Sequence, residues 1–541
     1  MAARLVPLGG VGEFGANALL VEHENGEAIL VDVGVAFSDL EPFGVAYEVP
    51  DFDALRHVSI QALLVTHGHD DHARGLEDAV QAFPGVPVAA SRATLARLRR
   101  AEGVPGEVQW LELGGDRQLP AAGFRVEVAP VSHSIPGTVV SRLRGESGTL
   151  VVASDFRLAP SALGETTPLD TLRGWGDAGV DVLLLDATNA LVPGPLVPEA
   201  TVAAAIEEEV AHARGAVVGV TFASHAGRFR QLARAALACG RTVVPVGRGL
   251  EETLAVQAEL GGLDLPPGAV RPPRALTRLP HEQLLLVATG SQGEPGSGLA
   301  RVAGDAVPGF RLAPGDVVLH CARVIPGNER RLADLFDHCA RRGARVITAE
   351  ERPIHVSGHP PRDELECVLR ALRPRVVVPV HGRRRQLEAL AELARGAGFG
   401  AQVVENGAEL LWRGGTVAPS GVHRGIGRLL VGEGDGAVLD PVTLRQRRSV
   451  AAGGLVVATL AVGTAASAGV GRPRVQGFGV EVPPEVRRAV ERELAEAVQH
   501  SVGTGTIDAE ALRSTMSRRL RRELRRRLGR RPSTLVVVSE C

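Results

Sequence analysis

The stretch Leu63-Leu-Val-Thr-His67-Gly-His69-Asp-Asp71-His72 decides the fold of this chain. A short apolar run that ends in histidines and aspartates predicts a buried strand followed by a loop of metal ligands. His67 and His69 alternate, so both imidazoles leave an extended segment on the same side. Asp71 and His72 follow closely enough to reach a second ion. The spacing therefore predicts half of a site for two metal ions.

This pattern resembles the ligand motif of the metallo-β-lactamase superfamily, where it supplies four ligands of a dinuclear zinc site. The resemblance implies further ligands at later strand ends, and His133, Asp155 and His381 each follow a valine-rich run. It assigns the ligands to two zinc ions that share Asp155, with the other ligands divided as follows: His67, His69 and His133 on one ion, and Asp71, His72 and His381 on the other.

Length and charge limit the classes of protein that fit. The 541 residues suffice for about three domains, and 45% apolar content indicates a globular chain. The net charge is −2, so only a local basic patch could attract nucleic acid. All 60 basic residues are arginine, which indicates a coding bias.

Cysteine usage and hydropathy favour the cytoplasm. The five cysteines form no C-x-x-C pair, and no apolar signal segment begins the sequence. The uncharged segment 450–471 is long enough to span a bilayer, for which about 20 apolar residues are needed. Because its side chains are mostly small, a strand over 454–462 followed by a small-residue turn is favoured, and no membrane association is expected.

The glycines of Gly10-Val-Gly12-Glu-Phe-Gly15 fit a dinucleotide-binding fingerprint, which also requires a helix after them. Instead, two apolar runs flank the turn at Glu24-Asn-Gly-Glu27 and predict an antiparallel pair of strands that brings Asp32 beneath the metal site. This opening resembles the start of ribonuclease J proteins, a subgroup of the β-CASP branch.

From about residue 199 to residue 349, helical segments alternate with valine-rich strands, before the seventh ligand, His381, is reached. This order predicts a second α/β unit inserted into the first. The expected fold class is α/β, a metallo-β-lactamase αβ/βα sandwich with an inserted β-CASP α/β domain and a small α+β C-terminal domain. The expected boundaries are 1–205 and 350–431 for the sandwich, 206–349 for the insertion, 432–449 for a linker and 450–541 for the C-terminal domain.

Three further segments resemble the substrate site of ribonuclease J. Asp186-Ala-Thr-Asn supplies a carboxylate after a buried strand, although Asp186 could also simply cap the following turn. The segment 221–230 departs from the family, because Gly227 stands where ribonuclease J proteins carry a histidine and His225 lies two residues earlier. The sequence leaves open whether His225 substitutes for it. The expected substrate contacts are Ser224, His225, Arg228, His355, Val356, Ser357, Gly358 and His359.

The resemblance implies a zinc-dependent ribonuclease with 5′-to-3′ exonuclease and endonuclease activity on single-stranded RNA, in RNA maturation and decay. Two zinc ions would activate water and clamp the attacking and leaving oxygens of an in-line displacement. Asp71, Asp186 and His359 are the expected catalytic residues, with His359 at the leaving 3′ oxygen. A DNA nuclease of the β-CASP branch and a weakly active scaffolding paralogue remain as alternatives.

The C-terminal region ends in an expected helix over 508–528. Its leucine and methionine side chains recur every four residues, and ten arginines stand between Arg513 and Arg531. The resemblance implies a homodimer or homotetramer formed through this region, and the apolar stripe is interpreted as the contact: Leu512, Met516, Leu520, Leu524 and Leu528. The arginine face is either solvated or contacts RNA or another subunit.

Overall fold

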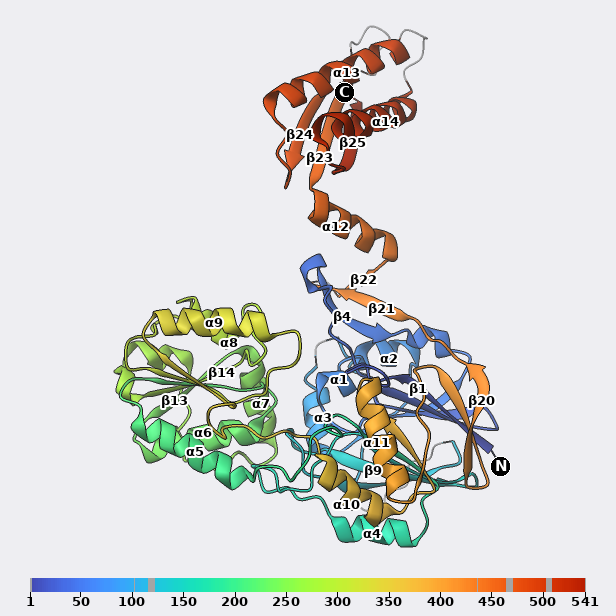
Figure 1. Cartoon of the computed structure of the whole chain (residues 1–541), viewed down its shortest axis with the longest axis vertical. Helices are drawn as coiled ribbons and strands as arrows, with labels where there is room; N and C mark the ends of the chain where they lie inside the picture. Colours follow the sequence, from blue (N-terminus) through green and yellow to red (C-terminus); the bar gives the residue numbers. More distant parts are fainter. Residues whose placement is uncertain are drawn as a thin grey trace. The chain divides into compact units, whose positions relative to one another are not determined.

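The computed structural model describes residues 2–101, 103–114, 122–434, 436–463, 470–502 and 508–540. The chain divides into two compact units, Met1–Ala36 with Val49–Arg428 and Phe37–Glu48 with Leu429–Cys541. Figure 1 traces the elements of both.

Two sheets with a common apolar core form the main body of the first unit. The larger has the order β20-β19-β1-β2-β3-β5-β6-β7. Its strands are β1 Ala2–Gly9, β2 Ala18–His23, β3 Glu27–Val31, β5 Ser59–Leu64, β6 Val88–Ala90, β7 Trp110–Glu112, β19 Ala408–Arg413 and β20 Thr416–His423. The smaller has the order β18-β17-β11-β10-β9-β8. Its strands are β8 Arg125–Pro130, β9 Val139–Gly145, β10 Gly148–Ala153, β11 Val182–Asp186, β17 Val376–Val380 and β18 Gly400–Ala401.

Helices accompany both sheets. Apolar side chains of three helices join the shared core: α4 Leu169–Asp177, α10 Arg362–Leu372 and α11 Arg384–Gly396. The helices that follow β5 and β6 are α1 Asp70–Ala73, α2 Leu76–Ala82 and α3 Arg92–Leu98. The αβ/βα sandwich expected from the sequence is confirmed.

The opening glycines do not precede a helix. β2 and β3 pair antiparallel, with Leu20 opposite Leu30, around the turn that the sequence predicted. The backbone of Asp32 follows β3 in the left-handed region, with φ +62°, which is uncommon for a residue other than glycine. The dinucleotide fingerprint is therefore excluded by the local fold.

A parallel sheet of order β13-β14-β12-β15-β16 forms the inserted α/β unit. Its strands are β12 Val217–Val220, β13 Thr242–Val246, β14 Leu284–Ala288, β15 Val317–His320 and β16 Arg345–Thr348. One face packs against α5 Glu199–His212, α6 Ala226–Ala238 and α7 Arg248–Glu259. The other packs against α8 Gly298–Ala303 and α9 Glu329–Arg341 (Figure 1). This is the inserted α/β domain that the sequence predicted, with its first helix beginning at Glu199.

The described residues of the second unit form two small sheets and three α-helices, with a short 3-10 helix at Glu41–Phe43. One sheet joins β4 Val45–Pro50, β21 Arg428–Gly432 and β22 Val438–Leu439; the other joins β24 Arg474–Phe478, β23 Leu455–Val462 and β25 Ser533–Glu540. The helices are α12 Pro441–Gly453, α13 Pro484–Val502 and α14 Ala509–Leu528. Most of the segment expected as a linker thus belongs to β22 and α12. The favoured strand at 454–462 is present as β23, while the turn expected after it falls largely on residues outside the described ranges.

The apolar stripe of α14 lies inside this unit. Leu512, Met516, Leu520 and Leu524 are buried in one cluster with residues of β23, β25 and α13, and Leu528 packs at its edge. The interpretation of the stripe as a contact between chains was wrong, because a four-residue period marks an apolar face without saying what covers it.

In the part of the chain that the structure describes, no helix is both long enough and apolar enough to cross a lipid bilayer.

Candidate metal centre

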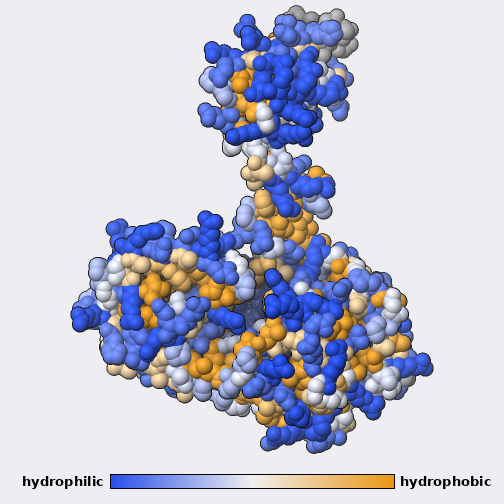
Figure 2. All heavy atoms as spheres, viewed as in Figure 1, coloured by the Kyte–Doolittle hydropathy of each residue, from blue (hydrophilic) through white to orange (hydrophobic). Residues whose placement is uncertain are grey.

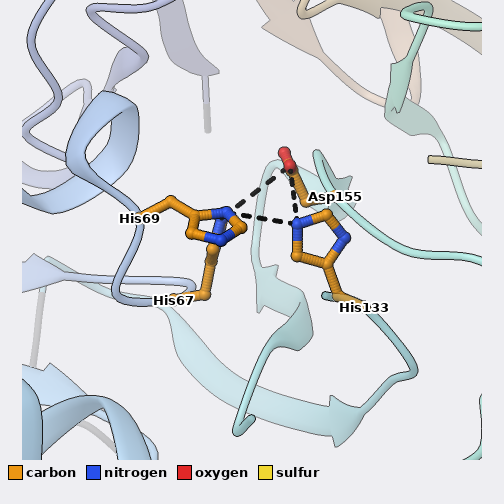
Figure 3. Close-up of side chains that lie close together, drawn as sticks. All are labelled: His67, His69, His133 and Asp155. Carbon is orange, nitrogen blue, oxygen red and sulfur yellow. Dashed lines mark hydrogen bonds and ion pairs between the residues drawn. The ribbon is translucent and has the colours of Figure 1, made fainter. Parts of the chain in front are cut away.

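Three histidines and one aspartate from distant segments converge on a single point. Figure 3 shows His67, His69, His133 and Asp155 directed toward one another. Nδ1 of His69 lies 3.1 Å from Nε2 of His67 and 3.3 Å from Nε2 of His133. Oδ2 of Asp155 lies 3.4 Å from Nε2 of His133. Three imidazole nitrogens and one carboxylate oxygen at these separations form a donor set of the kind that holds zinc.

A second group adjoins the first. Nε2 of His381 lies 3.2 Å from Oδ2 of Asp71, and Nε2 of His72 lies 3.1 Å from Oδ1 of Asp155. Asp155 therefore presents Oδ2 to the first group and Oδ1 to the second. The two oxygens of one carboxylate thus face different ligand groups.

Strand ends explain why these residues meet. Asp155 follows β10, Asp186 ends β11 and His381 follows β17, and these three strands are parallel neighbours. The carboxyl ends of parallel strands lie at one edge of a sheet, where ligands gather in α/β proteins. His381 also has φ +56°, a strained conformation for a residue other than glycine and one that recurs at functional sites.

Hydrogen bonds fix the orientation of three ligand imidazoles. Nδ1 of His72 lies 2.7 Å from Oδ2 of Asp32. Nδ1 of His133 lies 2.8 Å from the carbonyl oxygen of Gly358, and Nδ1 of His381 lies 2.7 Å from Oγ1 of Thr188. Each bond turns Nε2 of the same ring toward the centre, as is usual for metal-binding histidines.

Two orienting residues were absent from the predicted site. Thr188 lies in the quoted Asp186-Ala-Thr-Asn segment, which was a signal that could have identified it. Asn17, whose Nδ2 donates to the carbonyl oxygen of Asp71, follows the opening glycines. Both signals were local, but only the fold shows which side chain each residue contacts.

The two groups differ in protonation. Burial lowers the pKa of His67 and His133 well below the ordinary value and that of His69 to about 4. Burial also opposes charge on His72 and His381, but the attraction of Asp155 and neighbouring carboxylates outweighs it. The pKa of His72 is raised, and that of His381 rises to about 9. The three histidines of the first group are thus neutral before a metal ion binds, whereas His72 and His381 of the second group hold protons that a metal ion must displace.

His359 borders both groups. Its Nδ1 lies 2.8 Å from Oδ2 of Asp186 and 3.6 Å from Oδ2 of Asp155. Asp186 is fully buried, and its Oδ1 accepts a hydrogen bond from the backbone N–H of Thr188. Asp186 therefore both stabilises the local turn and contacts His359, so the two interpretations of this residue are compatible.

The segment 355–359 forms one wall of the site. Nδ2 of Asn189 donates to Oγ of Ser357 at 2.9 Å and to the carbonyl oxygen of His359. Oγ of Ser357 in turn accepts from the N–H of His359. Val356 is buried in the core of the inserted unit, so its side chain anchors the segment.

A buried charged cluster lies behind this wall. Glu199 contacts Arg157 at 2.8 Å and Arg228 at 3.2 Å, and all three side chains are nearly inaccessible to solvent. Sequence analysis missed Arg157 and Glu199, because an isolated charged residue gives no signal of burial. Nε and Nη2 of Arg228 have no hydrogen-bond partner among the described residues. Two arginines sharing one carboxylate leave an excess of positive charge at a buried position, which favours an anionic ligand.

The structure shows the surroundings of Gly227, which stands at the position of the family's histidine, and of His225, two residues earlier. A side chain at Gly227 would begin 2.7 Å from Cβ of Ala162, so the neighbouring segment fills that space. Nδ1 of His225 accepts a hydrogen bond from the backbone N–H of Arg228 at the start of α6, whereas its buried Nε2 has no partner in the described part of the chain. Ser224 and Gly68 line the same small cavity. Gly68 is the residue between the ligands His67 and His69 in the sequence.

Comparisons with known families match four consecutive parts of the chain. Residues 11–161 match the metallo-beta-lactamase superfamily and residues 214–339 match the ribonuclease J beta-CASP domain. Residues 343–404 match a Zn-dependent metallo-hydrolase RNA specificity domain, and residues 442–541 match the ribonuclease J C-terminal domain. The fold and the two ligand groups thus define a metal-dependent hydrolase of the metallo-β-lactamase superfamily.

Similarity to individual proteins extends over nearly the whole chain. Ribonuclease J of Mycolicibacterium smegmatis is 32% identical over 532 residues, covering 95% of this chain and 94% of that protein. Ribonuclease J of Sinorhizobium meliloti is 35% identical over 409 residues, covering 73% and 71%. The chain belongs to the ribonuclease J family.

More distant matches agree with this assignment. Ribonuclease J2 of Bacillus subtilis is 28% identical over 552 residues, covering 99% of this chain and 98% of that protein. A crystal structure of an Enterococcus faecalis protein of unknown function superposes with a TM-score of 0.54 at 16% identity. It covers 76% of this chain and all of that chain, and it supports the fold alone.

Proposed function

We propose that this chain is a ribonuclease that uses two zinc ions to remove nucleotides from the 5′ end of single-stranded RNA and to cut such RNA internally. The observation that carries the proposal is the sharing of Asp155 between two groups of largely buried ligands. Family membership and the match to an RNA specificity domain support RNA as the substrate.

The ligand set supports zinc in particular. Five imidazoles dominate the two groups, and nitrogen ligands favour zinc over magnesium or calcium, which prefer oxygen. When bound, two zinc ions supply Lewis acidity and lower the pKa of water in phosphoryl transfer.

His359 and Asp186 provide the proton for the leaving group. Water attacks phosphorus and gives up a proton to solvent, the bond from phosphorus to the 3′ oxygen breaks, and the 3′ oxygen takes a proton from His359. Asp186 fixes the ring through Nδ1, which directs Nε2 to the reaction, and raises the pKa of His359 against the effect of burial. The products carry a 5′-phosphate and a 3′-hydroxyl.

The buried cluster behind the wall supports recognition of a 5′-monophosphate. Arg228 and Arg157 lie close to His225 and His355. Nε and Nη2 of Arg228 and Nδ1 of His355 have no hydrogen-bond partner among the described residues, so they are available to a phosphate. Nε2 of His225 supplies the donor that the family draws from the position of Gly227. Charge-assisted hydrogen bonds contribute about 1.5–3 kcal/mol each, so loss of one weakens binding without abolishing it.

Paired substrates test this recognition. We expect faster exonucleolytic turnover of 5′-monophosphorylated RNA than of 5′-triphosphorylated RNA, since the triphosphate adds charge and bulk. His225→Ala should raise KM for the monophosphorylated RNA more than it lowers kcat. His212→Ala, an exposed change on α5, is the matched control. Equal rates on the two RNAs would contradict the pocket and leave a mainly endonucleolytic enzyme.

One experiment separates the alternatives for the activity itself. The complete ligand groups favour an active enzyme over a scaffolding paralogue. Zinc content and turnover are measured together on an RNA and a DNA of the same sequence. We expect two zinc ions and preferential cleavage of RNA; preference for DNA would establish the DNA nuclease, and absence of turnover in the zinc-loaded chain would favour the scaffold.

We also propose self-association through the C-terminal unit, now by a different surface from the stripe of α14. Helices α13 and α14 cover one face of the sheet β24-β23-β25, while the exposed apolar side chains Phe478, Leu535 and Val537 belong to its strands. Substituting Leu535→Asp and Val537→Asp should reduce the sedimentation coefficient to that of a monomer. The control substitutes two exposed residues of β20, Thr416→Asp and Ser420→Asp. A monomeric unsubstituted chain, or an unchanged oligomer in the first variant, would refute this surface.

Cysteine chemistry supports a cytoplasmic location. Cys239, Cys321, Cys339 and Cys367 are free thiols, while Cys541 lies outside the described residues. Burial raises the pKa of Cys321 to about 12, so this thiol is unreactive. Recovery of the protein mainly in a periplasmic or extracellular fraction of its cells would contradict this location.

A further inference from the structure

The exposed side of α14 is a concentrated basic surface. Between residues 508 and 531 the sequence has ten arginines and only three acidic residues, Asp508, Glu510 and Glu523, although the whole chain has a net charge of −2. Arg519 is half-buried and the remaining arginines are exposed: Arg513, Arg518, Arg521, Arg522, Arg525, Arg526, Arg527, Arg530 and Arg531. Figure 2 shows that hydrophilic residues predominate on the visible face of the region that contains α13 and α14.

Acidic neighbours neutralise only part of this surface. Glu493 on α13 contacts Arg519, Arg526 and Arg527, and the buried Glu523 contacts Arg522 and the last two of these. No ion pair within the described ranges involves the others: Arg513, Arg518, Arg521, Arg525, Arg530 and Arg531. A surplus of uncompensated guanidinium groups therefore remains along the helix and its end.

A concave surface at the end of α14 provides a second, independent observation. Arg530 and Arg531 line it together with Ser449, Gly453 and Gly479. Two arginines that line one concavity offer guanidinium groups that can bind a phosphate with several charge-assisted hydrogen bonds.

We propose that this arginine surface binds the sugar-phosphate backbone of RNA, as a contact separate from the metal centre. A helix of this length extends for about 30 Å, so its arginines form a line of charges that matches a chain of phosphates better than a single small anion. An acidic lipid surface fits less well, because a membrane-surface helix buries its apolar face in lipid. The apolar face of α14 is already buried in its own unit.

If the arginine surface binds the RNA backbone, the affinity for long RNA should depend on salt concentration rather than on the base sequence of the RNA. The surface offers guanidinium groups for phosphates, and the segment 508–531 contains no aromatic residue for stacking on bases. For single-stranded nucleic acid, each phosphate contact contributes about 0.7 to the slope of log K against log salt.

The test compares two fourfold arginine-to-glutamine variants of the full chain. The first replaces four arginines that form no ion pair with any described residue: Arg521, Arg525, Arg530 and Arg531. The control replaces four arginines of the other unit that are paired with carboxylates: Arg173, Arg341, Arg370 and Arg373. Glutamine keeps the helix propensity and removes the charge, and thermal unfolding checks that both variants are folded.

Binding of a 30-nucleotide single-stranded RNA is measured from 0.05 to 0.5 M salt, with metal present and turnover blocked by phosphorothioate linkages. We expect the first variant to bind at least tenfold more weakly in 0.15 M salt, with a slope smaller by about 2 to 3, and the control to match the unsubstituted chain. Unchanged affinity and slope in the first variant, or an equal loss in the control, would overturn the proposal. Loss of binding to vesicles of acidic phospholipid with unchanged RNA binding would overturn it in favour of a membrane contact.

A second measurement keeps this contact distinct from the proposed catalytic function. Cleavage of an unmodified RNA hexamer by the unsubstituted chain reports the metal centre. Absence of hexamer cleavage would contradict the ribonuclease proposal. The salt dependence of long-RNA binding would still show whether the arginine surface binds RNA.

Discussion

Nδ1 of His359 lies 2.8 Å from Oδ2 of Asp186, at the point where the carboxyl end of β11 meets the segment 355–359. Burial disfavours a charged imidazole, but the carboxylates of Asp186 and Asp155 outweigh this effect and raise the pKa of His359. A histidine that keeps its proton near neutral pH is suited to protonate a leaving oxygen. This pair therefore links the fold to the proposed chemistry.

Asp186→Asn should lower kcat on RNA by about 100-fold, within the range assigned to acid catalysis. Removing the charge lowers the pKa of His359, so the loss of activity on the alkaline side should begin at a lower pH. The pH profile of kcat measures both effects, with the exposed Asp177→Asn on α4 as the control. An unshifted pH profile with normal kcat would show that the contact between Asp186 and His359 plays no part in catalysis.

His381→Ala should remove one metal ion in preference to the other. The group of His67, His69, His133 and Asp155 keeps all its ligands in this variant. Elemental analysis of protein purified without chelator should give about two zinc ions for the unsubstituted chain and about one for the variant. His423→Ala, an exposed change, should retain two. Equal zinc contents in all three proteins would contradict the assignment of His381.

Metal binding should release protons at neutral pH. In the metal-free chain His381, whose pKa is about 9, and His72, whose pKa is also raised, hold protons that a metal ion must displace. Zinc affinity should therefore increase as pH rises toward about 9. Calorimetry at pH 7.5 in buffers of different ionisation enthalpy counts the released protons. A heat independent of the buffer would show that these rings are already neutral.

Glu199 should make the stability of the fold sensitive to acid. Burial alone would raise its pKa, but Arg228 and Arg157 hold it below the ordinary value. A carboxylate with a depressed folded-state pKa contributes stability above its unfolded value, near 4.3, and this contribution is lost as pH falls through the folded value.

Glu199→Gln should therefore lower the free energy of unfolding by about 3 kcal/mol at pH 7, because it leaves two buried arginines without a carboxylate. The difference from the unsubstituted chain should shrink below about pH 4. Urea unfolding of the metal-free proteins at pH 7 and pH 3.5 measures it, with the exposed Glu208→Gln as the control. A difference that is constant with pH would show that charge plays no part.

The sequence sufficed for much of the site because metal ligands follow short apolar strands. The pattern after Leu63-Leu-Val-Thr required a buried strand, and β5 ends at Leu64 as expected. His133 and His381 were found in the same way, since a valine-rich run before a ligand is a local signal. The inserted sheet was predicted because helical segments and strands alternate between the sixth ligand, Asp155, and the seventh, His381.

Other features depend on partners that are distant in the sequence. Periodicity revealed that one face of α14 is apolar, but only the structure shows that β23 and β25 cover it. Gly227 appeared as an unexplained departure until Ala162 was found against it. The cluster around Glu199 was invisible, because burial of a charged side chain is decided by neighbours from several segments.

Titration of the metal-free chain with zinc tests the central claim most directly. Hydrolysis of a 5′-monophosphorylated single-stranded RNA is followed at each ratio of zinc to protein, and mass spectrometry identifies the termini. We predict that activity saturates at two ions per chain and that the products carry 5′-phosphates and 3′-hydroxyls. Full activity without metal or at one ion per chain, or products ending in 3′-phosphates, would contradict a centre in which Asp155 joins two zinc sites.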